Sequence, residues 1–264
     1  MSLLPETSRR VTEIVTSAQS AGRVPSLVLG VVRDRALACF TGAGEAPRPD
    51  AKTQYRIGGI TKTMTAAMVM QLRDEGAFAL DDLVYRHLPG TSIGGVTLRQ
   101  LLAHVAGLQR EPDGDWWQRT TGGDTDRLIE GLSFEKISWP PYRAYHYSHL
   151  AYGVLGAVLQ RVTGETWSSL LAKRVIDPLG MKRTTYHPVE PFARGHVVHP
   201  WQHTLTEEPR HDAGAMAPAG QLWSTITDLA KWAGFLADPV PTVLSRETVA
   251  EMCVPVAISD LESW

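Results

Sequence analysis

Lys62 has the clearest potential for chemistry, because it lies in the first turn of a helix predicted over residues 61–76. Apolar residues recur every four positions from 60 to 72, which indicates a buried amphipathic helix closed by Gly76. Residues three apart share a helix face, so a side chain at position 59 would meet the Lys62 amine. An amine in a poorly solvated pocket has a lowered pKa and can take a proton from a nucleophile. Without further matches along the chain, a surface lysine in a first helical turn is the preferred interpretation.

Position 59, three residues before Lys62, is occupied by glycine, so it carries no side chain that could react. Thr61 cannot take its place, because two residues along a helix correspond to about 200° of rotation and its hydroxyl points away from Lys62. Glycine is also acceptable near a helix start on purely structural grounds. An engineered inactivation, a natural pseudoenzyme and a sequence variant would all place Gly59 here.

Five segments of the chain resemble the penicillin-recognising serine hydrolases. They occur in the order expected for that family and cover nearly the whole chain. The family includes class C β-lactamases, D-alanyl-D-alanine carboxypeptidases and related esterases, amidases and transacylases. The first resembles the Ser-x-x-Lys motif, the third the LL-x-H-x-x-GL stretch and the fourth the Tyr-x-Asn motif with its following helix. The segments are residues 55–65 (YRIGGITKTMT), 80–89 (LDDLVYRHLP), 97–108 (TLRQLLAHVAGL), 145–156 (YHYSHLAYGVLG) and 217–230 (APAGQLWSTITDLA).

The resemblance implies roles for particular residues. Tyr147 matches the tyrosine that shares the proton relay with the lysine, and which of the two is the base stays open. His149 stands where the family has asparagine, and a neutral histidine offers one donor and one acceptor on a bulkier ring. The backbone N–H of residue 59, at a helix N-terminus, is placed to receive a developing oxyanion.

Two neighbouring tryptophans are predicted to contact substrate, because Trp116 and Trp117 follow a loop that borders the cleft in this family. Ordinary packing is the alternative for both. His104 is predicted to be a hydrogen-bonded structural histidine and not a catalytic one.

The predicted fold class is α+β, β-lactamase/transpeptidase-like, with an antiparallel sheet flanked by helices and a mostly helical region. One unit is expected over 1–264: residues 1–58 form an N-terminal helix and hairpin, 59–187 the helical region, and 188–264 a loop system and helices that return to the α/β part. The predicted elements are a helix over 7–22, a hairpin of 26–32 and 36–40, helices from Thr97 to 102, over 152–162, over 168–175 and over 227–236, and a long ordered loop system over 188–220.

The family's last motif, Lys-Thr-Gly or His-x-Gly on a strand that lines the site, is expected to follow the stretch around Trp264, where the chain stops. The sheet is therefore expected to be incomplete. Two strands are not independently stable and an open edge invites pairing. We expect a separate C-terminal fragment or a second copy to complete the sheet, or disorder around the hairpin.

Composition excludes several classes of protein. A net charge of −2 with no basic cluster argues against nucleic-acid binding. The N-terminus is too polar for a secretory signal and the apolar runs are too short for a membrane span, so a cytoplasmic protein is expected.

Cys39 and Cys253 are predicted to be buried free thiols, with a disulfide as the alternative. His196, His199 and His203 lack the spacing of a zinc site, so no metal and no cofactor is expected.

The inferred parent function is hydrolysis or transfer of an acyl group through a serine ester, with a small-molecule ester, amide or β-lactam as substrate. The chain as written is expected to be inactive, because Gly59 replaces the nucleophile. The lack of an export signal favours an esterase, amidase or transacylase, for example of secondary metabolism, over a cell-wall peptidase or a secreted β-lactamase. The alternative is a non-catalytic binding protein that keeps the cleft without the chemistry.

Overall fold

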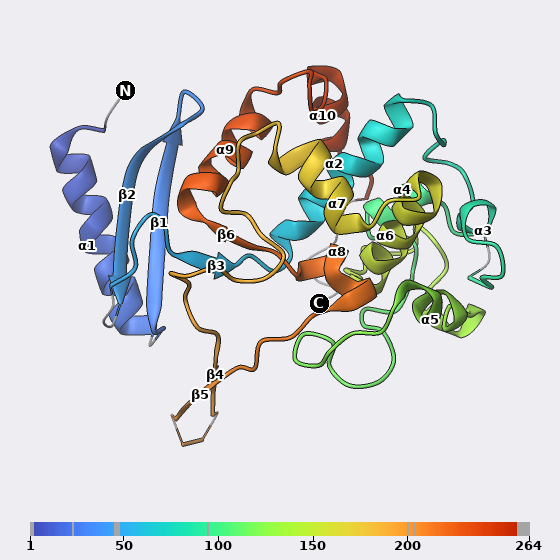
Figure 1. Cartoon of the computed structure of the whole chain (residues 1–264), viewed down its shortest axis with the longest axis horizontal. Helices are drawn as coiled ribbons and strands as arrows, with labels where there is room; N and C mark the ends of the chain where they lie inside the picture. The colour runs from blue at the N-terminus through green and yellow to red at the C-terminus, as the bar shows by residue number, and fades with distance from the viewer. Residues whose placement is uncertain are drawn as a thin grey trace. The chain divides into compact units, whose positions relative to one another are not determined.

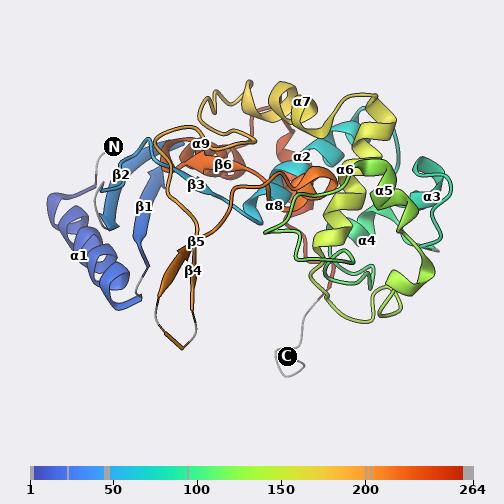
Figure 2. The ribbon, with the colours of Figure 1, turned by 60° about the horizontal axis from the view of Figure 1, so that its bottom comes forward.

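The computed structural model describes residues 3–22, 24–44, 48–93, 95–199, 201–202 and 204–257 (Figures 1 and 2). The chain forms two compact units. The first takes the described residues up to Ile57 together with Ile176–Glu208 and Leu222–Arg246. The second takes Gly58–Val175, Pro209–Gln221 and the described residues from Glu247 on. The predicted α+β class is confirmed, since the strands pair antiparallel in the first unit and helices dominate the second.

The first unit is built on the predicted N-terminal hairpin. Strand β1 (Ser26–Arg33) pairs antiparallel with β2 (Ala36–Gly44), in register from Ser26–Gly44 to Arg33–Ala36, with a bulge between Val31 and Val32. Helix α1 (Pro5–Gly22) covers one face of this pair and α9 (Ile226–Ala237) the other (Figure 1). A Cβ at Gly30 would meet Ile226 at 2.7 Å, so the glycine permits the close approach of α9. Among the described residues β1 and β2 pair only with each other, and completion of the sheet by further strands stays a prediction.

Two further strand pairs complete the first unit. Strand β3 (Gln54–Arg56) pairs with β6 (Trp223–Thr225), and β4 (His196–Val198) pairs with β5 (Leu205–Glu207), both antiparallel. The ordered loop system predicted over 188–220 therefore contains a hairpin that was not predicted, and its last four residues, Ala217–Gly220, are helical. The sequence does not predict this hairpin, because its strands are only three residues long. In addition, β5 is fully exposed, so it lacks the alternation of apolar and polar residues that is typical of a strand.

The second unit packs around two long buried helices, α2 (Ile60–Asp74) and α6 (His149–Thr163), with α8 (Ala217–Gly220) against both (Figure 1). A Cβ at Gly156 of α6 would lie 2.2 Å from Pro218, so glycine is needed for that contact. Shorter helices surround this core: α3 (Val84–His87), α4 (Leu98–Leu102), α5 (Thr125–Glu130), α7 (Trp167–Leu171), a π-helical turn (Ala172–Ile176) and α10 (Arg246–Met252).

Local capping chemistry explains where the predicted helices begin and end. Thr97 accepts a hydrogen bond from the Gln100 N–H at 3.3 Å, and the Gln100 side chain accepts one from the Thr97 N–H at 3.0 Å, which completes a capping box for α4. Gly164 ends α6 in the left-handed conformation, with φ of 71°. Thr225 caps α9 by accepting from the Asp228 N–H. The helix start predicted at Thr97 is confirmed, and the helices predicted over 152–162 and 227–236 are present as α6 and α9, although α6 begins three residues earlier than predicted.

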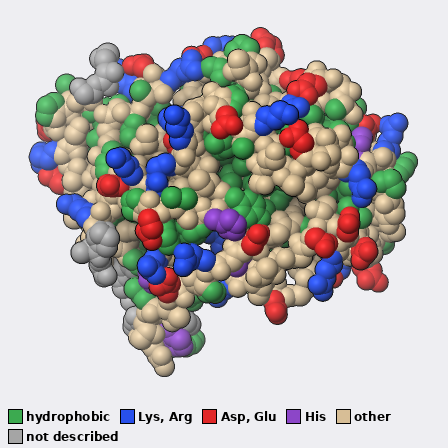
Figure 3. All heavy atoms as spheres, viewed as in Figure 1, with side chains coloured by type: hydrophobic (Ala, Val, Ile, Leu, Met, Phe, Trp, Pro, Cys, Tyr) green, Lys and Arg blue, Asp and Glu red, His purple; other side chains and the backbone are tan. Residues whose placement is uncertain are grey.

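Surface charge, helix length and the state of the cysteines can be compared with what the composition predicts. Acidic and basic side chains are interspersed on the face shown in Figure 3. No helix in the described part of the chain combines the length and the apolar character that crossing a membrane requires. Both cysteines are free thiols, but the prediction that they are buried was wrong, because Cys39 is half-buried and Cys253 is exposed.

Candidate active site

Gly59 is the N-cap of α2, at the start of a helix whose residues are mostly buried, as predicted. It is itself exposed, so position 59 is open to solvent. A Cβ built on Gly59 would lie 2.7 Å from Tyr147 Oη and 3.9 Å from Lys62 Nζ. A side chain at this position would therefore emerge between the tyrosine hydroxyl and the lysine amine, which is where a nucleophile needs its proton acceptor.

Lys62 is held by two acceptors in the interior of the second unit. Its side chain is buried, and Nζ donates to the Ala219 carbonyl at 2.6 Å and lies 3.0 Å from His149 Nδ1. Burial, opposed by Glu111 and reinforced by Arg110, lowers the pKa of Lys62 to about 8. A neutral Lys62 amine can donate one hydrogen to the Ala219 carbonyl and one to His149 Nδ1. Its lone pair is then available to accept a proton. Lys62 can act as a base near neutral pH.

Tyr147 packs over the lysine. Lys62 Nζ lies 4.8 Å from the Tyr147 ring centroid, and the Arg110 guanidinium lies 5.6 Å from the same centroid. Burial, the largest cause, raises the pKa of the Tyr147 hydroxyl. The phenol is therefore neutral near pH 7 and suited to donate a hydrogen bond. Among the described residues no hydrogen-bond acceptor holds this hydroxyl, and it lies against the empty position of the residue 59 side chain.

His149 connects the lysine to a carboxylate. It opens α6, where Ser148 caps the helix by accepting from the Ala151 N–H, and its Nε2 lies 3.7 Å from Glu111 Oε1. Burial first, and then Lys62 and Arg110, lower the pKa of His149 to about 3, so the ring is neutral. When Lys62 donates to Nδ1, the ring proton lies on Nε2, the nitrogen that faces Glu111.

Trp117 contacts this cluster from the loop before α5. Its indole Nε1 donates to Glu111 Oε2 at 2.6 Å, and its ring packs against His149 with centroids 5.1 Å apart. Trp116 behaves differently, because it is 52% exposed and stacks under the Arg119 guanidinium. The structure thus brings Trp117 to the site and leaves Trp116 on the surface.

His104 supports the site from behind. It adopts a positive φ of 57°, and its Nδ1 accepts from the Ser148 N–H at 3.1 Å, which ties its loop to the start of α6. Burial, the largest cause, lowers the pKa of His104 to about 3. Its contacts fit the structural role predicted for it.

Two participants were missed at the sequence level. Glu111 and the Ala219 carbonyl both engage the Lys62–His149 pair, yet neither belongs to a spaced motif of side chains. Of the histidines tested as metal ligands, His196 lies on β4 and His199 Nδ1 accepts from the Gln202 N–H, while His203 lies outside the described residues. Within the described ranges no three side chains of the metal-binding types converge.

A pH dependence of stability follows from the neutral histidine. Below about pH 6.5 His149 is protonated in the unfolded chain, whereas in the folded chain it stays neutral down to about pH 3. The unfolding free energy therefore falls as the pH falls from about 6.5 to about 3. We expect His149→Asn to reduce the slope by roughly 1 kcal/mol per pH unit. Urea unfolding at pH 7.5, 6.5 and 4.5 measures it, with pH 7.5 giving the effect of the substitution itself. Parallel curves for both proteins would contradict the assignment of a neutral His149.

Lys62 lies in the first turn of a buried helix, beside Tyr147 and one turn after position 59. This is the arrangement of a Ser-x-x-Lys acyl-transfer site with glycine in place of the serine. The chain belongs to the beta-lactamase family, whose family model matches residues 11–257.

Individual relatives agree with this assignment. The chain is 28% identical to beta-lactamase-like protein 2 of Dictyostelium discoideum over 97% of its own length and 50% of the relative. It is 29% identical to the D-alanyl-D-alanine-carboxypeptidase/endopeptidase AmpH of Escherichia coli K12 over 73% of its length and 51% of the relative. The solved structure of a D-stereospecific amidohydrolase from Streptomyces superimposes with a TM-score of 0.78 at 26% identity, covering 93% of this chain and 77% of that one. The chain thus spans about half the length of the two curated relatives.

Proposed function

We propose that this chain keeps the acyl-binding site of a serine acyl-transfer hydrolase but forms no acyl-enzyme. The observation that carries the proposal is the vacant position between Lys62 and Tyr147. A Cβ there would stand 3.9 Å from the amine and 2.7 Å from the phenol, but Gly59 provides no atom to attack a carbonyl. The base is present and its nucleophile is missing.

Amides, carboxylic esters and β-lactams are the substrate classes that the parent site would take. The carboxypeptidase and the amidohydrolase among the relatives support an amide, and the family supports acyl transfer in general. The open start of α2 gives a carbonyl access to the helix N-terminus, whose free N–H groups stabilise negative charge. Binding of such compounds does not require the nucleophile, because losing one reactive group leaves the rest of the pocket in place.

A hydrolysis panel tests the proposal. We expect the protein to show no hydrolysis of p-nitrophenyl acetate, a D-amino acid p-nitroanilide or a chromogenic cephalosporin above the rate of its Lys62→Met variant. That variant is the matched control, because it removes the base and keeps the volume of the side chain. Hydrolysis by the unaltered protein that disappears in Lys62→Met would show that the site works without a residue 59 side chain.

A further inference from the structure

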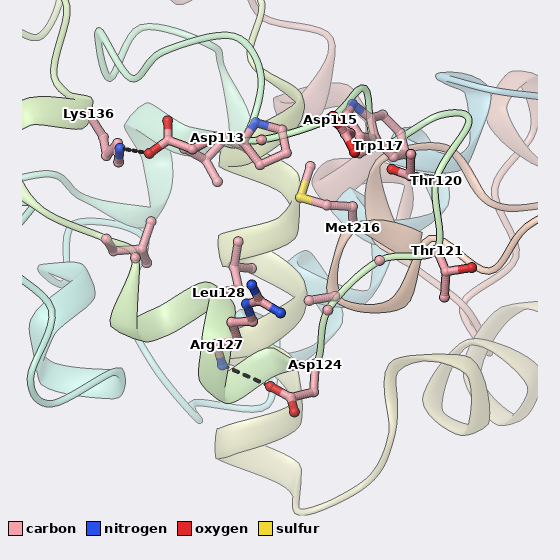
Figure 4. A pocket seen from close by; sticks show the side chains of 18 of the residues that line it. Asp113, Asp115, Trp117, Thr120, Thr121, Asp124, Arg127, Leu128, Lys136 and Met216 are labelled. Atoms are coloured by element: carbon pink, nitrogen blue, oxygen red, sulfur yellow. Dashed lines mark hydrogen bonds and ion pairs between the residues drawn. The ribbon is translucent and has the colours of Figure 1, made fainter.

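A cavity is lined in part by Trp117, whose ring also packs against His149, and His149 itself does not line it. Its volume is about 520 Å³, within the size range of small-molecule sites, and its lining contains neither Lys62 nor Tyr147. Figure 4 shows the loop around residues 113–124 passing over it, with α5 beside it and Met216 reaching in from the segment before α8.

The walls of this cavity are fixed by backbone contacts. The Gly122 N–H donates to Asp212 O at 2.8 Å and the Ala215 N–H donates to Gly123 O at 2.9 Å, which ties the covering loop to the segment below it. A Cβ at Gly122 would lie 2.0 Å from the Ala213 carbonyl oxygen, so the loop approaches as closely as glycine allows. The cavity is therefore formed before any ligand enters, which lowers the entropy that binding loses.

The floor of the cavity is apolar. Leu132, Leu150, Met216 and Trp117 line it and are at most 4% exposed. Such a surface favours a ligand with an apolar body, at roughly 25 cal/mol for each Å² removed from water.

The rim is charged, and its charges are unequally engaged. Asp113 is occupied, because it is ion-paired to Lys136 and accepts from Gln109 Nε2 at 2.9 Å. Asp124 caps α5 by accepting from the Arg127 N–H at 2.8 Å. Figure 4 shows the Asp113–Lys136 ion pair and the Asp124–Arg127 hydrogen bond.

Two charged groups of the rim remain available to a ligand: the guanidinium of Arg127 and the carboxylate of Asp115. Both side chains are exposed, and neither forms an ion pair with another of the described residues. The stem of Arg127 passes Gly123, where a Cβ would lie 3.3 Å from Arg127 Cδ, and the guanidinium extends beyond Leu128 toward the cavity (Figure 4).

We propose that this cavity binds a small zwitterion with an apolar body, such as a short peptide or amino-acid derivative. Its carboxylate pairs with Arg127, its ammonium with Asp115, and its apolar side chains rest on Leu150 and Met216. A simple anion fits less well, because the rim holds three carboxylates against two cations. The assignment requires no acyl-enzyme and therefore stands apart from the function proposed for Lys62.

Calorimetric titration with the dipeptide leucyl-leucine tests the proposal. We expect saturable one-to-one binding, weakened about tenfold or more by Arg127→Gln, the loss of one charge-assisted contact. Asp115→Asn is expected to weaken it in the same direction. The N-acetylated dipeptide should mimic the loss of Asp115, and the dipeptide amide the loss of Arg127. Arg161→Gln is the matched control, since Arg161 is an exposed arginine of the same unit outside the cavity.

Three results would overturn the proposal. One is an absence of binding at millimolar dipeptide. Another is equal binding by Arg127→Gln and by the unaltered protein. The third is binding lost in Lys62→Met but kept in Arg127→Gln, which would place the dipeptide at the candidate active site. Circular dichroism of each variant confirms that the rim substitutions leave the fold intact, as their exposure predicts.

Discussion

Gly59→Ser is expected to turn a chain that takes no acyl group into one that is labelled once by a fluorophosphonate. The new hydroxyl would stand beside the Lys62 amine, whose pKa of about 8 makes it a competent base near neutrality. Tyr147 Oη must first move by a few tenths of an ångström, because it lies 2.7 Å from the new Cβ position. A hydroxyl at the end of a side chain can make that movement. The labelling rate should rise with pH up to about 8, as Lys62 loses its proton.

Two controls separate this prediction from simple filling of space. Gly59→Ala introduces the same Cβ without a hydroxyl and should remain unlabelled. Gly59→Ser combined with Lys62→Met keeps the hydroxyl without its base, and should react at least a hundredfold more slowly, the usual contribution of a general base. Equal labelling with and without Lys62 would remove the lysine from its proposed role.

Gly107→Ala is expected to destabilise the fold by about 3 kcal/mol or more. Gly107 has a φ of 68°, which costs other L-residues about 1–2 kcal/mol, and steric overlap adds about 1–3 kcal/mol. The overlap is severe, because a Cβ would lie 1.8 Å from the Trp139 carbonyl oxygen. The Gly107 carbonyl also accepts from the Ser138 N–H at 2.8 Å, so the chain cannot simply move aside. Urea unfolding of the two proteins measures the difference.

Gly95→Ala is the matched control for this substitution. No heavy atom lies within 4 Å of its ideal Cβ, so the change should alter the unfolding free energy by less than about 0.5 kcal/mol. A Gly107→Ala protein as stable as the Gly95→Ala protein would mean that the segment after α4 does not need this backbone conformation. That segment matters to the site, because the carbonyl of Arg110 accepts from the His149 N–H at 2.8 Å.

Local signals made much of the fold predictable. Thr97 and Thr225 begin helices because their hydroxyls accept hydrogen bonds from the first turn, and Gly164 ends α6 because a residue without a Cβ adopts a positive φ readily. The short helices α3 and α5 escaped prediction, because one turn or so of helix contains too few residues to show a period of 3.6. The β4–β5 hairpin was not predicted because strands of three residues are too short to show a period of two.

The site was predictable where a motif fixes spacing, and unpredictable where the contact is tertiary. Lys62, Tyr147 and His149 were named from sequence, and the structure brings them together. Glu111 reaches His149 from a loop with no periodic pattern, so only the fold reveals it. Trp116 and Trp117 could not be told apart, because adjacent loop residues carry no signal of which one turns inward.

The most direct test of the missing nucleophile is the intact mass of the unaltered protein after prolonged incubation with a fluorophosphonate and, separately, with benzylpenicillin. A mass equal to that of the untreated chain is expected in both cases, because no atom at Gly59 can bond to phosphorus or to a carbonyl carbon. One stoichiometric adduct that peptide mapping places on residues 57–72 would contradict the account.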